Sequence, residues 1–448
     1  MTLAEIIDRQ REFKNLTQQM KKIISTLIVL TFFNNTNAQK IFTSDINNFW
    51  SAYDSIQKVN NNKSEILESL FLSKNTEGLN AFMQIKKFDK NDYLTAFEKY
   101  PKFWNSIRPN ALIDAKKIKT IKKALTKLKK LYPNNSKGNI YYTIGTLKSG
   151  GTTNNEDLLL GIEKIVGNEN TIVSEFENEN LQKMFQFSKT TTIEQVTIHE
   201  FVHTFQKDGE INVLSKAIKE GSCDFIAELT LNKKFNSHYI DFGFKNYEQV
   251  KSQFKSEMFS QNFGNWFYNS ELSKNPDLGY FVGYVISKKY YENSKDKKKA
   301  IKDIIELDFN NELDVLQLLE KSKYFDEKIN VSQIKSTYKE NQPKVLKVLE
   351  FENGHQNVKS DIKQIQIVFS KPMNDNISIN FSKNGKEHFP LKRIIGLDET
   401  KTILTLETIE LKSDTEYDFY ITNRGTKSSD GFPFVEQEYK ITFKTEKK

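Results

Sequence analysis

Two histidines one helical turn apart are the residues with the clearest chemical meaning in this sequence. Residues 192 to 206 read TIEQVTIHEFVHTFQ, in which His199 and His203 flank Glu200. Side chains four residues apart project from one face of a helix, so both imidazoles can reach a single ion. Glu200 lies beside them, where it can contact a water on that ion. The pattern predicts a zinc site.

The apolar neighbours of the two histidines favour this interpretation over a chance spacing on a surface helix. Ile198, Phe201, Val202 and Phe205 surround the motif, which is typical of a helix buried inside a domain. Two imidazoles without partners would be costly there, because burying an unpaired polar group raises the free energy of the folded state.

A catalytic zinc needs a third protein ligand and an open position for water. A third histidine six residues beyond His203 is excluded, because Gly209 occupies that position and Gln206 stands where that class has a glycine. The candidate carboxylates are Glu220, Glu228, Asp208 and Glu210. Cys223 could also bind zinc, although a small buried residue is the simpler interpretation.

The spacing of Glu220 and Asp224 after the histidine motif resembles the metal site of thermolysin-like enzymes, the gluzincins. This resemblance implies that Glu220 is the third zinc ligand. It also implies that Asp224 accepts a hydrogen bond from the far nitrogen of His199 and thereby fixes its tautomer. Only sixteen residues separate His203 from Glu220, fewer than in thermolysin, so the connection between the two helices must be short.

The chain also resembles a group of bacterial predicted zinc-dependent proteases of gluzincin type. The resemblance covers most of residues 40 to 325 and implies a mostly helical, zincin-like metallopeptidase domain with a small β-sheet. The matching segments are Ile144-Gly145, Ser149 to Thr152, His199 to Gln206, Glu220 to Phe225, Gly279 to Tyr284 and Tyr290-Tyr291.

The predicted chemistry is hydrolysis of a peptide bond by a zinc-activated water. Glu200 would take the proton of the water and later pass it to the leaving amine. Tyr280 and Tyr284, four apart on one face of a later helix, could donate a phenol to the oxyanion. The same spacing fits two aromatic residues in a core, and that interpretation is favoured.

The composition is that of a large folded chain with a solvated, basic surface. A length of 448 residues with 37% hydrophobic residues favours two domains. The net charge of +8 comes from dispersed lysines, which argues against nucleic-acid binding. The densest basic stretch, residues 116 to 130, has its apolar residues at helical spacing, so it indicates a solvated helix face; an anionic partner is the alternative.

The first forty residues predict export. Lys21 and Lys22 precede an apolar run from Ile23 to Phe33, and a small residue, Ala38, follows shortly after. This pattern predicts a signal peptide over residues 20 to 38, and residues 1 to 19 are interpreted as an upstream mis-start. We therefore expect a periplasmic, cell-surface or extracellular protein without a transmembrane segment in the mature chain.

Hydrophobic periodicity divides the chain into a helical part and a β part. Helices are predicted from residue 41 to about 131 and again up to residue 340, with the metal motif on helices over 191–207 and 211–231. Two strands, 139–147 and 158–165, are predicted with a hairpin-length turn between them. The fold class is α+β, with domains at 40–342 and 343–448.

Short alternating runs after Pro343 predict a small all-β sandwich. This region, about Pro343 to Lys448, resembles the bacterial Ig-like domains of S-layer and cell-surface proteins. Such domains usually space or dock, so no chemistry is assigned to it; a face rich in Tyr and Phe could contact a glycan or the cell surface. The matching segments are Ile365 to Ser370, Lys371 to Met373, Thr402 to Leu406, Leu411, Thr415 to Tyr417, Asp430-Gly431 and Phe443 to Thr445.

We therefore expect an exported zinc metallopeptidase that acts on peptides or proteins, with Zn²⁺ as its cofactor. The alternative is a non-catalytic cell-surface binding or adhesion protein in which zinc only braces two helices. A structural zinc usually has four protein ligands, and no obvious fourth ligand lies near the motif. Glu200 has no use in a structural site, which favours catalysis. Hydrolysis of a non-peptide amide would use the same residues.

Overall fold

The computed structural model describes residues 39–133, 138–168, 170–187, 192–235, 237–270 and 275–447. The predicted signal peptide over 20–38 and the segment 1–19 lie outside these residues. Within these described residues the structure is 47% helix and 16% sheet, with a helical N-terminal part and a C-terminal β region. This confirms the α+β class in outline, while the zincin-like assignment stays a prediction. Within the described ranges, no helix is both long enough and apolar enough to cross a bilayer.

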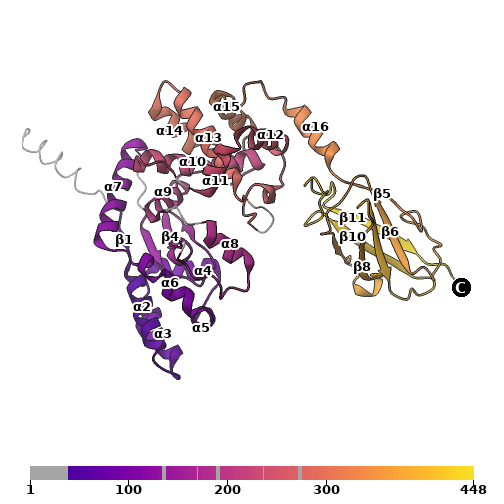
Figure 1. Cartoon of the computed structure of the whole chain (residues 1–448), viewed down its shortest axis with the longest axis horizontal. Helices are drawn as coiled ribbons and strands as arrows, with labels where there is room; N and C mark the ends of the chain where they lie inside the picture. The colour runs from indigo at the N-terminus through magenta and orange to yellow at the C-terminus, as the bar shows by residue number, and fades with distance from the viewer. Residues whose placement is uncertain are drawn as a thin grey trace, which may run out of the picture. The chain divides into compact units, whose positions relative to one another are not determined.

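The chain forms two compact units, which meet in sequence at Glu175 and Phe176. This division differs from the predicted boundary at residues 342 and 343, which stays a prediction. The unit that ends at Glu175 combines helices with a small sheet (Figure 1). Its elements are β1 (Ile41–Phe42), α2 (Ser44–Ile56), α3 (Lys63–Leu70), α4 (Glu77–Lys86), α5 (Lys90–Lys99), α6 (Pro101–Ala111), α7 (Ala115–Leu131), β2 (Ile140–Thr143), β3 (Gly151–Asn154) and β4 (Asp157–Gly161).

Aromatic side chains form the centre of the first unit. Phe49 on α2 contacts the rings of Phe97 on α5 and Trp104 on α6 at centroid distances of 5.3 and 5.1 Å. The lysine-rich α7 buries Ile121 and Leu128 and leaves most of its lysines exposed. This arrangement follows from its apolar spacing and agrees with the predicted solvated face.

The sheet of the first unit corrects the predicted hairpin. Its strand order is β1-β2-β4-β3, and β2 runs parallel to β4. The glycine-rich segment between them contains β3, which pairs antiparallel with β4. The tight turn lies at Asn155, whose φ of 53° is left-handed. Asparagine tolerates this backbone conformation, so the two-residue turn forms there and the glycine-rich segment is free to form a strand.

The second unit begins with nine helices among its described residues. They are α8 (Glu179–Phe187), α9 (Ile193–His203), α10 (Val213–Leu231), α11 (His238–Lys245), α12 (Tyr247–Glu257), α13 (Leu278–Asn293), α14 (Lys297–Ile305), α15 (Glu312–Ser322) and α16 (Val331–Asn341). Helix α10 is central, because it contacts α9, α13, α14 and α15.

The two helices that carry the metal motif are each fixed at their first turn. Thr192 and Gln195 form a capping box at the start of α9, and Asn212 and Ser215 form one at the start of α10. Helix α9 ends at His203, four residues before the predicted end. Gly209 follows with a left-handed φ of 92°, which glycine adopts without strain.

Two glycines let the backbones of α10 and α13 touch. A Cβ atom at Gly221 would lie 2.1 Å from the backbone nitrogen of Tyr284. One at Gly283 would lie 1.6 Å from the carbonyl oxygen of Ala217. Both distances are far inside van der Waals contact, so only glycine fits at these positions.

The C-terminal β region has two sheets around one apolar core. Their strand orders are β5-β6-β9-β8 and β11-β10-β7. Ile365 and Leu406 of the first sheet share a cluster with Phe419 and Ile441 of the second. The strands are β5 (Val345–Val348), β6 (Gln364–Phe369), β7 (Ser378–Asn380), β8 (Leu391–Leu397), β9 (Ile403–Thr408), β10 (Glu416–Thr422) and β11 (Glu438–Lys444). The Ig-like assignment of this region stays a prediction.

Candidate metal centre

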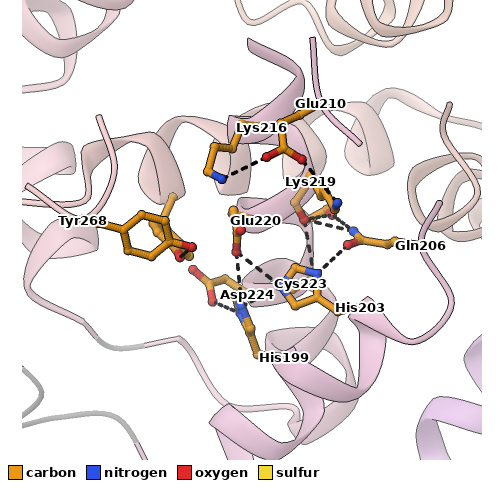
Figure 2. Close-up of polar contacts among 12 residues, drawn as sticks. His199, His203, Gln206, Glu210, Lys216, Lys219, Glu220, Cys223, Asp224 and Tyr268 are labelled. Carbon is orange, nitrogen blue, oxygen red and sulfur yellow. Dashed lines mark hydrogen bonds and ion pairs between the residues drawn. The ribbon is translucent and has the colours of Figure 1, made fainter. Parts of the chain in front are cut away.

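The structure brings three predicted ligand atoms together between α9 and α10 (Figure 2). The Nε2 atoms of His199 and His203 lie 3.2 Å apart. The Oε2 atom of Glu220 lies 3.3 Å from Nε2 of His203 and 3.7 Å from Nε2 of His199. These side chains are largely buried, because α10 covers the face of α9 from which the histidines project.

The other ring nitrogen of each histidine faces a hydrogen-bond acceptor. Nδ1 of His199 lies 2.7 Å from Oδ1 of Asp224, so the predicted contact is present. Nδ1 of His203 lies 2.7 Å from Oε1 of Gln206. The amide of Gln206 is oriented, because its nitrogen donates to the carbonyl of Lys219 and to the hydroxyl of Ser222, each over 2.9 Å.

These partners determine which ring nitrogens carry hydrogen. An ionised carboxylate and an amide oxygen can only accept, so Nδ1 of both His199 and His203 must donate. In the neutral rings, Nε2 is then a bare lone pair. The two lone pairs and the carboxylate of Glu220 face one another with no donor between them, and such an arrangement is unfavourable unless positive charge lies at its centre.

The spacing of the three atoms fits a zinc ion. Ligands about 2.1 Å from a tetrahedral zinc lie about 3.3 Å from one another. The observed separations of 3.2, 3.3 and 3.7 Å are close to this value. The residues present therefore fit the ion that the sequence predicts.

The electrostatics of the centre also favour positive charge. Burial alone would lower the pKa of His199, but the carboxylates of Asp224 and Glu220 outweigh burial and hold that pKa well above its usual range. Burial would raise the pKa of Glu220, but the two histidines hold it well below its usual range. A bound cation meets the same electrostatic demand as a proton on the imidazoles.

Cys223 offers a second possible ligand set. Its sulfur is buried, and the ligand atoms of His199, His203 and Cys223 all lie within 4.8 Å of one another. However, the sulfur lies 3.5 Å from Nδ1 of His203, the nitrogen that donates to Gln206. Both Nε2 atoms face Glu220 instead, so the geometry favours Glu220 as the third ligand.

The other candidate carboxylates are engaged elsewhere. Glu228 accepts hydrogen bonds from Lys288 and from the hydroxyl of Tyr284, over 2.9 and 2.8 Å. Glu210 pairs with two lysines of α10. Asp208 is exposed after the end of α9. The structure does not bring these three carboxylates to the histidines.

The two tyrosines predicted as oxyanion donors occupy different environments. Tyr284 is fully buried and its hydroxyl bonds Glu228, which agrees with the interpretation as a core residue. The ring of Tyr280 lies 6.1 Å from the ring of His199, and its hydroxyl lies 3.4 Å from that of Tyr268. Glu200 follows His199 on α9 and is partly exposed. Only Tyr280 of the two tyrosines therefore adjoins the histidines.

Three residues at the centre were not predicted: Gln206, Tyr239 and Tyr268. Gln206 lies three residues after His203, a spacing that brings side chains together on helical turns and that could have signalled the contact. Tyr239 donates to Oδ2 of Asp224 over 2.9 Å from α11, and Tyr268 lies in the connection before α13. These two contacts depend on tertiary packing and have no local signal.

Comparison with known proteins gives no functional guide. No family model matches the chain, and no curated protein matches it. Among solved structures, the S-layer protein rSbsC(31-844) is 15% identical with a TM-score of 0.18, covering 60% of this chain and 36% of that one. The N-terminal part of the bacterial S-layer protein SbsC is 14% identical with a TM-score of 0.18, covering 60% and 63%. The chain spans less than two thirds of either structure, and similarity at this level supports no inference.

Proposed function

We propose that this chain is a zinc-dependent metallopeptidase whose zinc ligands are His199, His203 and Glu220. The observation that carries the proposal is the convergence of two Nε2 lone pairs and one carboxylate oxygen at the spacing of zinc ligands. Both imidazoles are held in the required tautomer by Asp224 and Gln206.

The bound zinc would lower the pKa of a water and polarise the carbonyl of the scissile bond. Glu200 would accept the proton of the attacking water and transfer it to the leaving amine. Asp224 and Gln206 keep the imidazoles aimed at one point. The ring of Tyr280 lies 6.1 Å from that of His199, and its hydroxyl, which contacts that of Tyr268, would donate to the oxyanion.

Export belongs to the same proposal. The predicted signal peptide over residues 20–38 would deliver the chain to the periplasm, cell surface or medium. The C-terminal β region would act there as an Ig-like domain that holds the enzyme away from the cell surface or attaches it there. Its partner would be a glycan or another component of the cell surface.

One observation favours a second candidate function. Cys223 could close the fourth position around a metal if the ring of His203 turned, because its sulfur is already 3.5 Å from that ring. A fully closed site would be structural, and the chain would then be a cell-surface binding or adhesion protein braced by zinc.

The test measures zinc content and cleavage of a mixed peptide library by the purified protein and by three variants. Glu200→Gln should retain one zinc per chain and lose cleavage by about a hundredfold or more, because the general base is removed. Glu194→Gln, on the first turn of the same helix, should behave like the original protein. Cys223→Ser should retain both zinc and cleavage.

The two proposals predict different results in this experiment. Zinc that is retained without any cleavage, and that is lost in Cys223→Ser, would establish the structural site. Absence of zinc from the original protein would overturn both.

A further inference from the structure

An aromatic wall continues from the metal centre to a lysine on α10. The ring of Tyr280, which adjoins His199, lies 5.7 Å from the ring of Phe267. Lys216 Nζ lies 5.6 Å from the centroid of Phe267 and 5.4 Å from that of Tyr268. Figure 2 draws Lys216 and Tyr268 next to Glu220. Lys216 precedes Glu220 by one helical turn, so both side chains leave the same face of α10.

The charges of the ion-paired trio Glu210, Lys216 and Lys219 do not cancel, and the nearby carboxylate of Glu220 belongs to the proposed metal centre. Glu210 pairs with Lys216 over 3.1 Å and with Lys219 over 3.4 Å. The side chains of the lysines are only 14% and 17% exposed, and the described residues offer no second carboxylate within ion-pairing distance of either. This trio therefore carries a net positive charge in a place where water screens it weakly.

Tyr268 is held in an uncommon conformation at the outer end of this wall. Its φ of 53° is left-handed, which is strained for a residue with a side chain. The conformation is maintained because its backbone N–H donates to Oδ1 of Asp277 over 2.6 Å. Although aromatic, Tyr268 is 71% exposed. Strain that is retained to expose an aromatic ring beside a candidate site points to a contact with a ligand.

We propose that Lys216, with Tyr268 as its aromatic wall, forms a subsite that binds a carboxylate of the substrate beside the metal centre. This inference rests on the proposed function. A carboxylate would compensate the positive charge of the lysine trio, and the aromatic rings would strengthen the interaction by limiting the access of water. Glu200 and Glu220 would repel the same group from the centre and so orient the peptide.

A substrate carboxylate can come from a free C-terminus or from an Asp or Glu side chain. The test therefore uses four N-terminally fluorescein-labelled hexapeptides of one sequence. They carry a free or amidated C-terminus and Asp or Asn at one internal position. Binding is measured by fluorescence anisotropy to the zinc-loaded Glu200→Gln protein, which should bind without cleaving.

We expect one of the charged forms to bind about tenfold more tightly than its neutral counterpart. This is the ratio of dissociation constants that a single charge-assisted hydrogen bond produces. A preference for the free acid over the amide would identify the C-terminus as the ligand. A preference for Asp over Asn in the amidated peptides would identify the side chain. Adding Lys216→Met should abolish the preference, and adding Tyr268→Ala, at an exposed position, should weaken it several-fold.

Lys251→Met is the matched control. Lys251 is 13% exposed, pairs with Asp326 over 2.9 Å and lies 6.0 Å from two aromatic rings, but it belongs to α12. This variant should keep the preference unchanged. Binding without any charge preference, a preference that survives Lys216→Met in folded protein, or no binding of any peptide would overturn the subsite.

Cleavage by the unsubstituted protein separates this inference from the proposed function. Cleavage without a charge preference would support the peptidase and contradict the carboxylate subsite. A preference that depends on Lys216 in a protein that never cleaves would leave the subsite standing and remove the peptidase.

Discussion

At the scale of single residues, the two imidazoles depend on hydrogen bonds made on the side away from the proposed ion. Asp224 is fully buried and accepts from both His199 and Tyr239, while Gln206 is held in turn by α10. Such outer partners set the tautomer and the orientation of a ligating histidine. The proposed metal affinity therefore depends on these hydrogen-bond partners as well as on the ligands themselves.

Replacing Asp224 tests this dependence. We expect Asp224→Asn to lower zinc affinity about 10- to 100-fold. The substitution removes the negative charge that orients the His199 ring and strengthens its binding to the zinc ion. Competition with a fluorescent zinc chelator measures the affinity. Tyr239→Phe removes only one hydrogen bond to Asp224 and should have a smaller effect. Equal affinities for Asp224→Asn and the original protein would contradict the role of His199 as a ligand.

The histidine motif of the candidate metal centre could be predicted from the sequence. Most of the residues that surround it in the structure could not. The spacing of His199 and His203 is a local property of one helix, so helical geometry places both imidazoles on one face. The choice of Glu220 among the candidate carboxylates came from the resemblance to thermolysin-like enzymes. Lys216 lies one turn before Glu220 on α10, but Tyr268 meets Lys216 only because the segment before α13 packs against α10. No pattern along the chain encodes that contact.

At the scale of elements, the close approach of α10 and α13 fixes the position of Glu220. Gly221 follows this residue directly and meets the backbone of Tyr284. An added methyl group could be accommodated only by moving one helix, and packed helices resist such movement.

The substitution Gly221→Ala tests whether the backbones of α10 and α13 are in contact, through the direction in which the free energy of unfolding changes. Alanine in place of glycine normally stabilises a helix by up to about 1 kcal/mol. Here we expect a loss of about 1–3 kcal/mol in the free energy of unfolding, because the new Cβ overlaps α13. Weaker zinc binding should accompany it. Urea unfolding measures the first effect and chelator competition the second.

Gly264→Ala is the control for this prediction. Gly264 lies in the turn Phe263–Asn265, and a Cβ there meets nothing within 4 Å. Its free energy of unfolding should change by less than about 0.5 kcal/mol. A stabilised Gly221→Ala protein would mean that the two backbones are not in contact.

The elements that sequence reasoning misplaced share a physical cause. The parallel pairing of β2 with β4 depends on β3 forming within a glycine-rich segment that reads as a turn. Strand β8 lies outside every predicted alternating run, because it leaves most of its side chains exposed and so lacks the alternation that identifies strands. By contrast, α10, which was predicted over residues 211–231, begins and ends within two residues of those bounds.

At the scale of the whole molecule, the first unit contains a buried titratable group in the 3-10 turn Ile162–Lys164, directly after β4. Glu163 is fully buried and accepts from the backbone N–H groups of Gly145 and Leu147, over 2.9 and 3.1 Å. Burial nevertheless raises its pKa to about 7. The carboxyl is therefore protonated in the folded chain under conditions where it is ionised in the unfolded chain.

The stability of the chain should fall between pH 5 and pH 8 because of this group. A pKa raised on folding gives stability that is fully present below the unfolded value, 4.5, and is lost as the pH rises through about 7. The loss is roughly 3 kcal/mol by linkage. Urea unfolding of the original protein and of Glu163→Gln across this range should show their difference shifting by that amount in favour of the variant. A constant difference would contradict the raised pKa.

The position of Cys223 has a consequence for following the molecule in solution. It is the only cysteine in the sequence, it is fully buried, and it lies one turn after Glu220 with its sulfur against His203. A thiol reagent can reach it only when α10 locally separates from its neighbours. The chain thus contains a natural single-site reporter, whose labelling rate follows the transient opening of the proposed metal centre without any introduced probe.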